Sequence, residues 1–127
     1  MIDDIDRPDV VHEVSAALQR YEDALVADDV DTLIELFWDS ELTLRFGPTE
    51  SLHGAAEIAA FRKTRTQGDL TRDVERIQVT AFGDDVAIAT VEYTRRSNGH
   101  RGRQSQTWVR TGAGWRIVLA HVSMLQG

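Results

Sequence analysis

A polar stretch near the C-terminus carries the side chains best suited to binding a small ligand. Residues 102 to 110 read GRQSQTWVR. Side chains alternate along a strand, so Gln104, Gln106 and Trp108 share one face. Amides and an indole N–H that line a cavity can bind carbonyl oxygens, or water. The sequence leaves open whether this row or the opposite row, Arg103, Ser105 and Thr107, faces the cavity.

The strand expected next, residues 115 to 125, is mostly apolar but contains His121. If the turn at 112 to 114 sets Gln106 opposite His121, both side chains face a cavity together with Trp108. A one-residue slip would place Ser105 opposite His121 instead, and the sequence does not fix the register. In an apolar strand a histidine is more often a hydrogen-bonded core residue than a ligand-binding one.

Two further polar side chains, Tyr21 and Arg45, have apolar neighbours. Tyr21 falls on the apolar stripe of a predicted helix, where its hydroxyl either meets a backbone carbonyl or enters a cavity and donates to a substrate carbonyl. Arg45 lies between Leu44 and Phe46 on a predicted strand, so it is either solvated or deliberately buried. A buried guanidinium could bind a carboxylate through two parallel hydrogen bonds and thereby orient the adjacent amide.

The remaining candidates are expected to be mainly structural. Trp38 could form a wall of the cavity, although packing is its commoner role. Arg62 and Arg65 end a predicted helix, where cations are favoured, and are expected to be solvated. The acidic runs DDIDRPD and ADDVD lack the spacing of a calcium loop, and the histidines show no ligand pairing. We therefore expect no metal and no other cofactor.

Hydrophobic periodicity predicts the elements that must position these residues. Apolar side chains recur at helical spacing over residues 8 to 27, and a second, short helix runs to about Trp38. Residues 42 to 46 alternate as a short strand, and residues 54 to 65 form a third helix. Four β-rich runs follow, at about 70–82, 85–96, 101–111 and 115–125, separated by turn signals. This order predicts one α+β domain over residues 1–127, with three N-terminal helices packed on a curved, mainly antiparallel sheet that encloses a cavity.

Composition narrows the class of protein. The 127 residues suffice for one domain, and the absence of cysteine excludes disulfides and thiol chemistry and suits the cytoplasm. The chain has 14 Lys and Arg against 21 Asp and Glu, and this net charge of -7 argues against a nucleic-acid or anionic-membrane partner. No signal peptide or membrane span is evident. An anionic substrate would need a local cluster of positive groups.

The run from 115 to 125 is apolar on both faces. A central strand has this pattern when helices cover one side of the sheet and a second subunit covers the other. We therefore expect a homodimer, with Gln104, Gln106 and Trp108 toward the cavity and Arg103 toward the dimer contact.

The order of elements and the phrase TWVRTGAGWRIVLAHVS resemble the nuclear transport factor 2-like, or SnoaL-like, cone fold. More narrowly, the segments RYEDALVADDVDTLIELFWDS, TLRFGPTESLHG and GRQSQTWVR resemble the AtzH-like family. The resemblance covers nearly the whole chain. It implies small anionic substrates related to 1-carboxybiuret or oxalurate, a homodimer packed through the sheet, and a pocket with a tyrosine from the first helix and an arginine from the first strand. Those positions match Tyr21 and Arg45.

The combined expectation is a cofactor-independent amidohydrolase that cleaves a C–N bond in a small carboxylated urea or biuret compound. Arg45 would bind the carboxylate, Tyr21 would polarise the carbonyl or pass a proton, and Gln106 and His121 would position water or the leaving amide. No strong base is evident, so a substrate carboxylate or a decarboxylation-assisted route could share the work. The missing base also supports a second hypothesis, a non-catalytic binding or accessory subunit that partners an amidase. A third, an isomerase or dehydratase, needs an inward acid, for which only Glu92 is a candidate.

Overall fold

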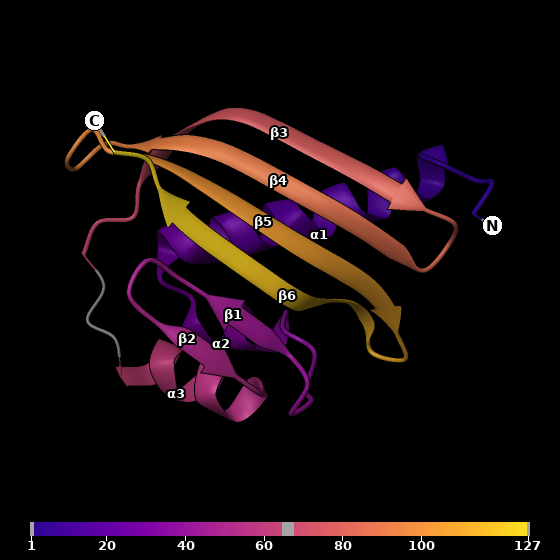
Figure 1. Ribbon diagram of the computed structural model, residues 1–127, viewed down its shortest axis with the longest axis horizontal. Helices are drawn as coiled ribbons and strands as arrows, with labels where there is room; N and C mark the ends of the chain where they lie inside the picture. Colours follow the sequence, from indigo (N-terminus) through magenta and orange to yellow (C-terminus); the bar gives the residue numbers. More distant parts are fainter. Residues whose placement is uncertain (1, 65–67, 127) are drawn as a thin grey trace.

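The computed structural model describes residues 2–64 and 68–126, which form helices packed on one curved sheet (Figure 1). In chain order the elements are α1 (Pro8–Ala27), α2 (Val30–Glu35), β1 (Leu44–Phe46), β2 (Ser51–His53), α3 (Ala55–Thr64), β3 (Arg72–Phe82), β4 (Val86–Arg95), β5 (Arg101–Thr111) and β6 (Gly114–Met124). The expected α+β architecture and its three N-terminal helices are confirmed.

The six strands make a single sheet in the order β2-β1-β6-β5-β4-β3. All neighbouring strands are antiparallel except β1 and β6, which are parallel. The helix α1 crosses one face of the long strands, whereas α2 and α3 lie beside the short hairpin β1–β2 (Figure 1). The strand β2 was not predicted, because three residues are too few to show an alternating pattern.

The sequence explains where α1 begins and ends. Pro8 occupies the first turn, where its missing N–H costs no hydrogen bond. The apolar stripe that predicted the helix is buried along its length: Val10, Val14, Leu18, Tyr21 and Leu25. The helix ends at Asp28, which has a left-handed backbone (φ 54°) and whose N–H bonds back to the carbonyls of Ala24 and Leu25.

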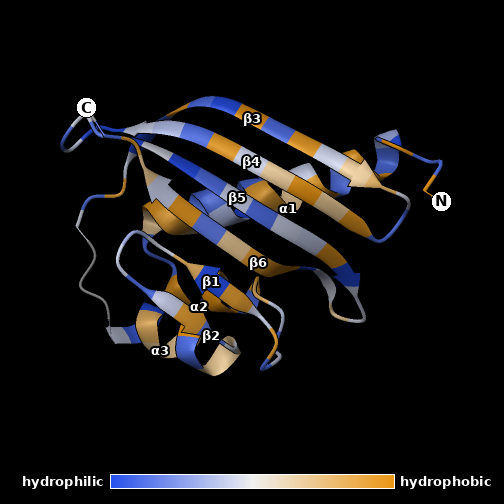
Figure 2. Cartoon of the chain, viewed as in Figure 1, coloured by the Kyte–Doolittle hydropathy of each residue, from blue (hydrophilic) through white to orange (hydrophobic). Residues whose placement is uncertain are grey.

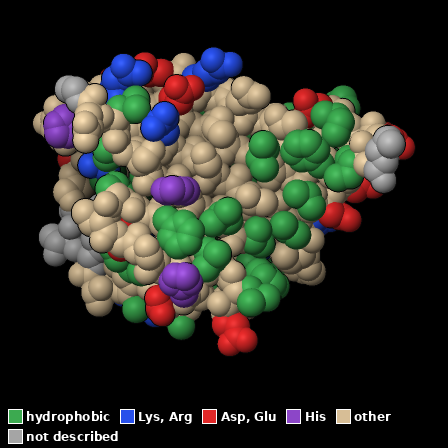
Figure 3. Space-filling model, in the orientation of Figure 1, with side chains coloured by type: hydrophobic (Ala, Val, Ile, Leu, Met, Phe, Trp, Pro, Cys, Tyr) green, Lys and Arg blue, Asp and Glu red, His purple; other side chains and the backbone are tan. Residues whose placement is uncertain are grey.

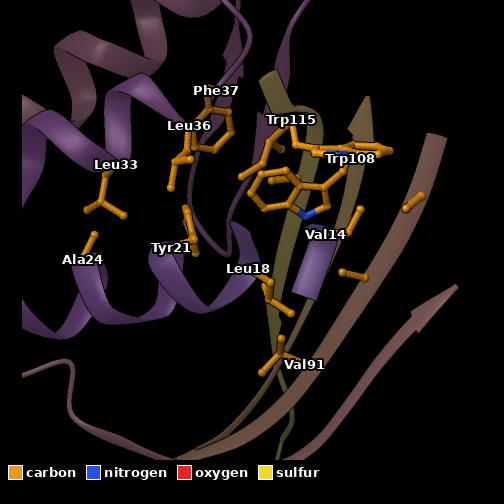
Figure 4. Packing of buried hydrophobic residues seen from close by; sticks show 14 of the residues in the cluster. Val14, Leu18, Tyr21, Ala24, Leu33, Leu36, Phe37, Val91, Trp108 and Trp115 are labelled. Carbon is orange, nitrogen blue, oxygen red and sulfur yellow. The ribbon is translucent and has the colours of Figure 1, made fainter. Parts of the chain in front are cut away.

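The core lies between α1, α2 and the inner face of β4, β5 and β6. Trp108 is fully buried and points from β5 toward the helices, where it belongs to the same core cluster as Leu18 of α1, Val91 of β4 and Phe37 (Figure 4). The helix α2 ends at Glu35, before the expected limit at Trp38. The chain there leaves the helix because Phe37 forms an isolated bridge with Ile117, and the Trp38 N–H donates to the Ile117 carbonyl over 2.9 Å.

The register of β5 and β6 decides which polar residues face inward. A bulge interrupts the pairing between Thr107 and Trp108, so that Ser105 lies opposite His121 and Gln106 lies opposite Ala120. The pairing of Gln106 with His121 is therefore wrong, and the one-residue slip is what the structure adopts. His121 is exposed on the outer face of the sheet, away from the helices.

The same register confirms the inner row of β5. Gln104, Gln106 and Trp108 are buried, whereas Arg103 and Ser105 are exposed on the outer face. In the hydropathy view the polar strand β5 runs between more apolar neighbours (Figure 2). The sheet thus sends two amide side chains toward the helices.

Candidate functional site

A pocket lies between the C-terminal half of α1, the end of α3 and the inner face of the sheet. Its lining residues are Tyr21, Leu25, Arg45, Arg62, Leu70, Arg72, Tyr93, Arg95, Gln104 and Val122. The pocket has a volume of only about 30 Å³, roughly the room that one water molecule takes. A second cavity, of about 280 Å³, shares Arg45, Arg95 and Val122 with it. The two therefore adjoin, and we call them the inner and outer pockets.

The inner pocket is strongly positive in a chain whose net charge is -7. Four of its residues are arginines: Arg45, Arg62, Arg72 and Arg95. Two of them pair with carboxylates, Arg45 with Glu50 and Arg72 with Glu22. Among the described residues neither of the other two has a carboxylate partner, so the site carries an excess of two positive charges. This is the local cluster of positive groups that an anionic ligand requires.

Tyr21 and Arg62 both line the inner pocket and are hydrogen-bonded to each other. Each exposes 2% of its surface, and Arg62 Nη2 donates to Tyr21 Oη over 2.8 Å. A phenol can accept and also donate a hydrogen bond. Because Arg62 fills an acceptor position, and the hydroxyl donates to no described residue, its proton remains available to a ligand. The Nε of Arg62 is buried and has no hydrogen-bond partner among the described residues.

Arg45 lies where the inner and outer pockets meet. Its Nη1 donates to Glu50 Oε1 over 2.6 Å, and its guanidinium stands 5.1 Å from the centre of the Phe61 ring. Burial works to raise the pKa of the Glu50 carboxyl, but hydrogen bonds from Thr49 and Arg45 and the charge of Arg45 outweigh it and hold that pKa below its ordinary value. The Nε of Arg45, like that of Arg62, is buried and has no hydrogen-bond partner in the part of the chain that the structure describes. Glu50 therefore binds only one of the three nitrogens of this guanidinium.

A third group of contacts joins Glu22 of α1 to the strand residues Arg72 and Gln104, which line the inner pocket. Arg72 donates to both oxygens of the Glu22 carboxylate, from Nε to Oε1 over 3.2 Å and from Nη2 to Oε2. Gln104 Nε2 lies 3.5 Å from Oε2 of the same carboxylate. The Arg72 guanidinium stacks 4.0 Å from the centre of the Tyr93 ring. Tyr93 in turn packs over Gly102 on β5, where a Cβ would come well within 3.0 Å of the ring. The absence of a side chain at position 102 thus makes room for the ring that supports Arg72.

Five of the site residues expected from the sequence are buried on the inner side of the sheet, in two groups. Tyr21, Arg45 and Gln104 line the inner pocket. Gln106 and Trp108 lie further along the inner face, where Trp108 Nε1 donates to Gln106 Oε1 over 3.0 Å. Gln106 Nε2 is buried and has no described partner. Neither lines the two pockets.

Two expected site residues lie elsewhere. His121 points outward, with its ring 5.8 Å from that of Phe46, because the β-bulge reverses its face. Trp38 is half-buried beyond the end of α2 and lines neither pocket.

The expectation that Arg62 is solvated is wrong, because this side chain points inward from the last turn of α3 and binds Tyr21 of α1. Arg65 lies outside the described residues.

Several residues of the site were missed at the sequence level: Glu22, Arg62, Arg72, Tyr93 and Arg95. The pairing of Arg72 with Arg95 across the β3–β4 hairpin could not be read from the sequence, because a bulge between Val74 and Arg76 shifts the register by one residue. Like charges in a cross-strand pair are unfavourable unless something else compensates them. Among the described residues, no group of three or more His, Asp or Glu side chains could hold a metal ion. No described helix is long and apolar enough to cross a membrane.

Solved structures share this fold over nearly the whole chain. A protein of unknown function from the DUF3225 family of Pectobacterium atrosepticum is 46% identical, with a TM-score of 0.94 and coverage of 99% of this chain and 98% of that one. A cystatin-like fold protein from Burkholderia xenovorans is 39% identical, with a TM-score of 0.93 and 98% of each chain covered. A nuclear transport factor 2-like superfamily protein from Salmonella enterica is 27% identical, with a TM-score of 0.78 and coverage of 94% and 93%.

These likenesses confirm the nuclear transport factor 2-like cone expected from the sequence. No curated protein matches the chain. The AtzH-like family model matches residues 3–127. Because the match spans almost every residue, the chain belongs to the AtzH-like family.

Proposed function

We propose that this protein is a cofactor-independent amidohydrolase whose substrate is a small carboxylated urea or biuret compound. The observation that carries the proposal is the inner pocket, where four arginines are met by only two carboxylates. A buried cation is unfavourable unless it is paired, so such a site favours a negatively charged ligand. The resemblance to the AtzH-like family supplies the chemical class, for which 1-carboxybiuret and oxalurate are the test compounds.

The two pockets suggest how such a substrate binds. The inner pocket is too small for a whole molecule, so one polar group enters it while the remainder occupies the outer pocket. Arg45 lines both pockets, so its guanidinium can offer an N–H to a substrate carboxylate. Tyr21 has a hydroxyl proton available, and the carbonyl of the scissile amide is a suitable acceptor.

In the proposed reaction a water molecule adds to the amide carbon, the C–N bond breaks, and the nitrogen leaves as ammonia after gaining a proton. Tyr21 stabilises the oxygen that becomes negative in the tetrahedral intermediate, or passes the proton to the leaving nitrogen. Gln104, held at the Glu22 carboxylate, borders the same space and can orient the amide.

The test is release of ammonia from oxalurate and 1-carboxybiuret by the purified wild-type protein, with Tyr21→Phe as the matched variant. The ring still fills its place on α1, so the thermal midpoint should hardly change. Turnover should fall roughly 10- to 1,000-fold, the range for loss of one proton-transfer group or one oxyanion donor. Full activity in Tyr21→Phe would remove the hydroxyl from the mechanism.

A second candidate is a non-catalytic ligand-binding or accessory subunit that partners an amidase. It is favoured by one observation: both carboxylates at the site, Glu22 and Glu50, are ion-paired with arginines, which leaves neither free to act as a base. Binding of oxalurate without release of ammonia would select this candidate. An isomerase or dehydratase is less well supported, since Glu92 is exposed on the outer face.

A further inference from the structure

We propose that Arg62 is the residue that binds the negatively charged group of the ligand. That group would supply the counter-charge for Arg62, which has no carboxylate partner among the described residues. The inference rests on the proposed function only for the class of ligand. It assigns a binding role to a residue that the sequence places at a solvated helix end.

The surroundings of Arg62 are unusual for a buried cation. The side chain exposes 2% of its surface, yet its one hydrogen-bond partner among the described residues is the neutral hydroxyl of Tyr21. Its Nε is buried and has no hydrogen-bond partner within residues 2–64 and 68–126. Arginine is almost never fully buried without a paired acid, because desolvation of the charge is costly. The arrangement is explained if a carboxylate entering the inner pocket completes the pairing.

The other arginines of the pocket differ from Arg62 in this respect. The side chains of Arg45 and Arg72 are 5% and 6% exposed, and each is bound to a glutamate. Arg95 is less buried, so water can screen its charge. Arg62 is thus the arginine of this pocket that combines deep burial with the lack of a carboxylate partner within the described chain.

The helix that carries Arg62 compensates only part of this charge. Arg62 lies in the last turn of α3, where the partial negative charge of the helix end favours a cation. That effect is small compared with the cost of desolvating an ion. The ligand-free protein is therefore expected to be less stable than it would be with an apolar side chain at this position.

If the inference holds, the charge of Arg62 lowers the stability of the ligand-free protein but increases its affinity for an anionic ligand, and one substitution can test both effects. Arg62→Met keeps a long, flexible side chain in the core but removes the charge. It should leave the thermal midpoint of the ligand-free protein unchanged or raised. Arg72→Met is the matched contrast, since it strands the buried Glu22 carboxylate and should lower the midpoint. Arg20→Gln, at an exposed arginine of α1, controls for loss of one positive charge from the molecule.

Affinity for oxalurate, measured by calorimetry, is the decisive readout, together with affinity for an analogue in which a neutral amide replaces the carboxylate. Wild type and Arg20→Gln should prefer oxalurate over the neutral analogue. Arg62→Met should bind oxalurate about 10- to 100-fold more weakly, the range for loss of a hydrogen bond to a charged group. Its affinity for the neutral analogue should change little.

Three results would overturn the inference: unchanged affinity of Arg62→Met for oxalurate, equal losses on both compounds, or no binding of oxalurate to the wild type. A large fall in the ligand-free midpoint of Arg62→Met would show a structural role instead. The proposed function fails separately, if the wild type binds oxalurate with Arg62-dependent preference but releases no ammonia.

Discussion

At the scale of single residues, the arginines of the site differ from one another in whether a carboxylate of the protein balances their charge. Arg45 and Arg72 each pair with a carboxylate, so the positive charge of each is balanced within the protein. Arg62 has a phenol instead. A ligand carboxylate has two oxygens, and can accept from Arg45 with one and from Arg62 with the other, since both arginines line the inner pocket. On this view the two residues recognise the same group from different sides.

Arg45→Lys tests the contribution of the planar guanidinium. Lysine keeps the positive charge and can still pair with Glu50, but it has no second donor in a fixed planar arrangement. We expect little change in stability and a loss of about 2 to 4 kcal/mol in transition-state binding, measured as kcat/KM on the carboxylated substrate. On the neutral-amide analogue, wild type and variant should be nearly equal. Additive losses from variant and analogue would mean that Arg45 does not hold the carboxylate.

The Arg45–Glu50 pair also predicts a pH dependence of stability. The pKa of the Glu50 carboxyl is held below its ordinary value of 4.5, so the folded state favours the ionised form. The pair's contribution is complete above that ordinary value and is lost as the pH falls through the lower pKa of the folded state. Thermal midpoints of wild type and Glu50→Gln, measured between neutral and acid pH, should therefore converge as the pH falls. A constant gap between them would contradict the assignment.

At the scale of elements, local pattern predicted most of the fold, because each signal is carried within one helix or strand. The stripe from Val10 to Leu25 marks α1, and the alternation on β5 separates Gln104 from Arg103. The face of His121 was not predictable in this way, since a single bulge between Thr107 and Trp108 shifts the pairing. The inward turn of Arg62 was missed for a similar reason. A cation in a last helical turn looks solvated until the neighbouring α1 is in place.

The strand β5 also shapes the site through a glycine, Gly102, whose lack of a side chain leaves room for the Tyr93 ring. Gly102 lies beneath the Tyr93 ring, and that ring supports the Arg72 guanidinium. Gly102→Ala should force the buried ring to move, destabilise the protein by about 1 to 3 kcal/mol as overpacking does, and weaken oxalurate binding. The matched control is Gly112→Ala, where an added Cβ meets nothing within 4 Å. Equal chemical-denaturation midpoints for the two variants would show that Tyr93 adjusts without cost.

At the scale of the whole molecule, the sheet has one face covered by α1 and another that presents apolar side chains to the surface. The outer face carries Leu44, Phe46, Val86, Ile88 and Leu119, of which the last three are exposed. In the space-filling view of this side, hydrophobic side chains gather over the strands, with histidines among them (Figure 3). Burial of such a surface is favourable, and contiguous apolar patches mark interaction sites.

We therefore expect a homodimer joined through the outer face, as the resemblance to the AtzH-like family also implies. Sedimentation at micromolar concentration should give about twice the chain mass of 14.3 kDa. Ile88→Asp places a charge on that face without touching either pocket, and should shift the mass toward the monomer. Ile77→Asp is the matched control, because Ile77 is similarly exposed (46% against 43%) but pairs with the inward-facing Val91, on the opposite face of the edge strand β3. A wild-type mass near 14.3 kDa, or equal dissociation by both variants, would place the contact elsewhere or remove it.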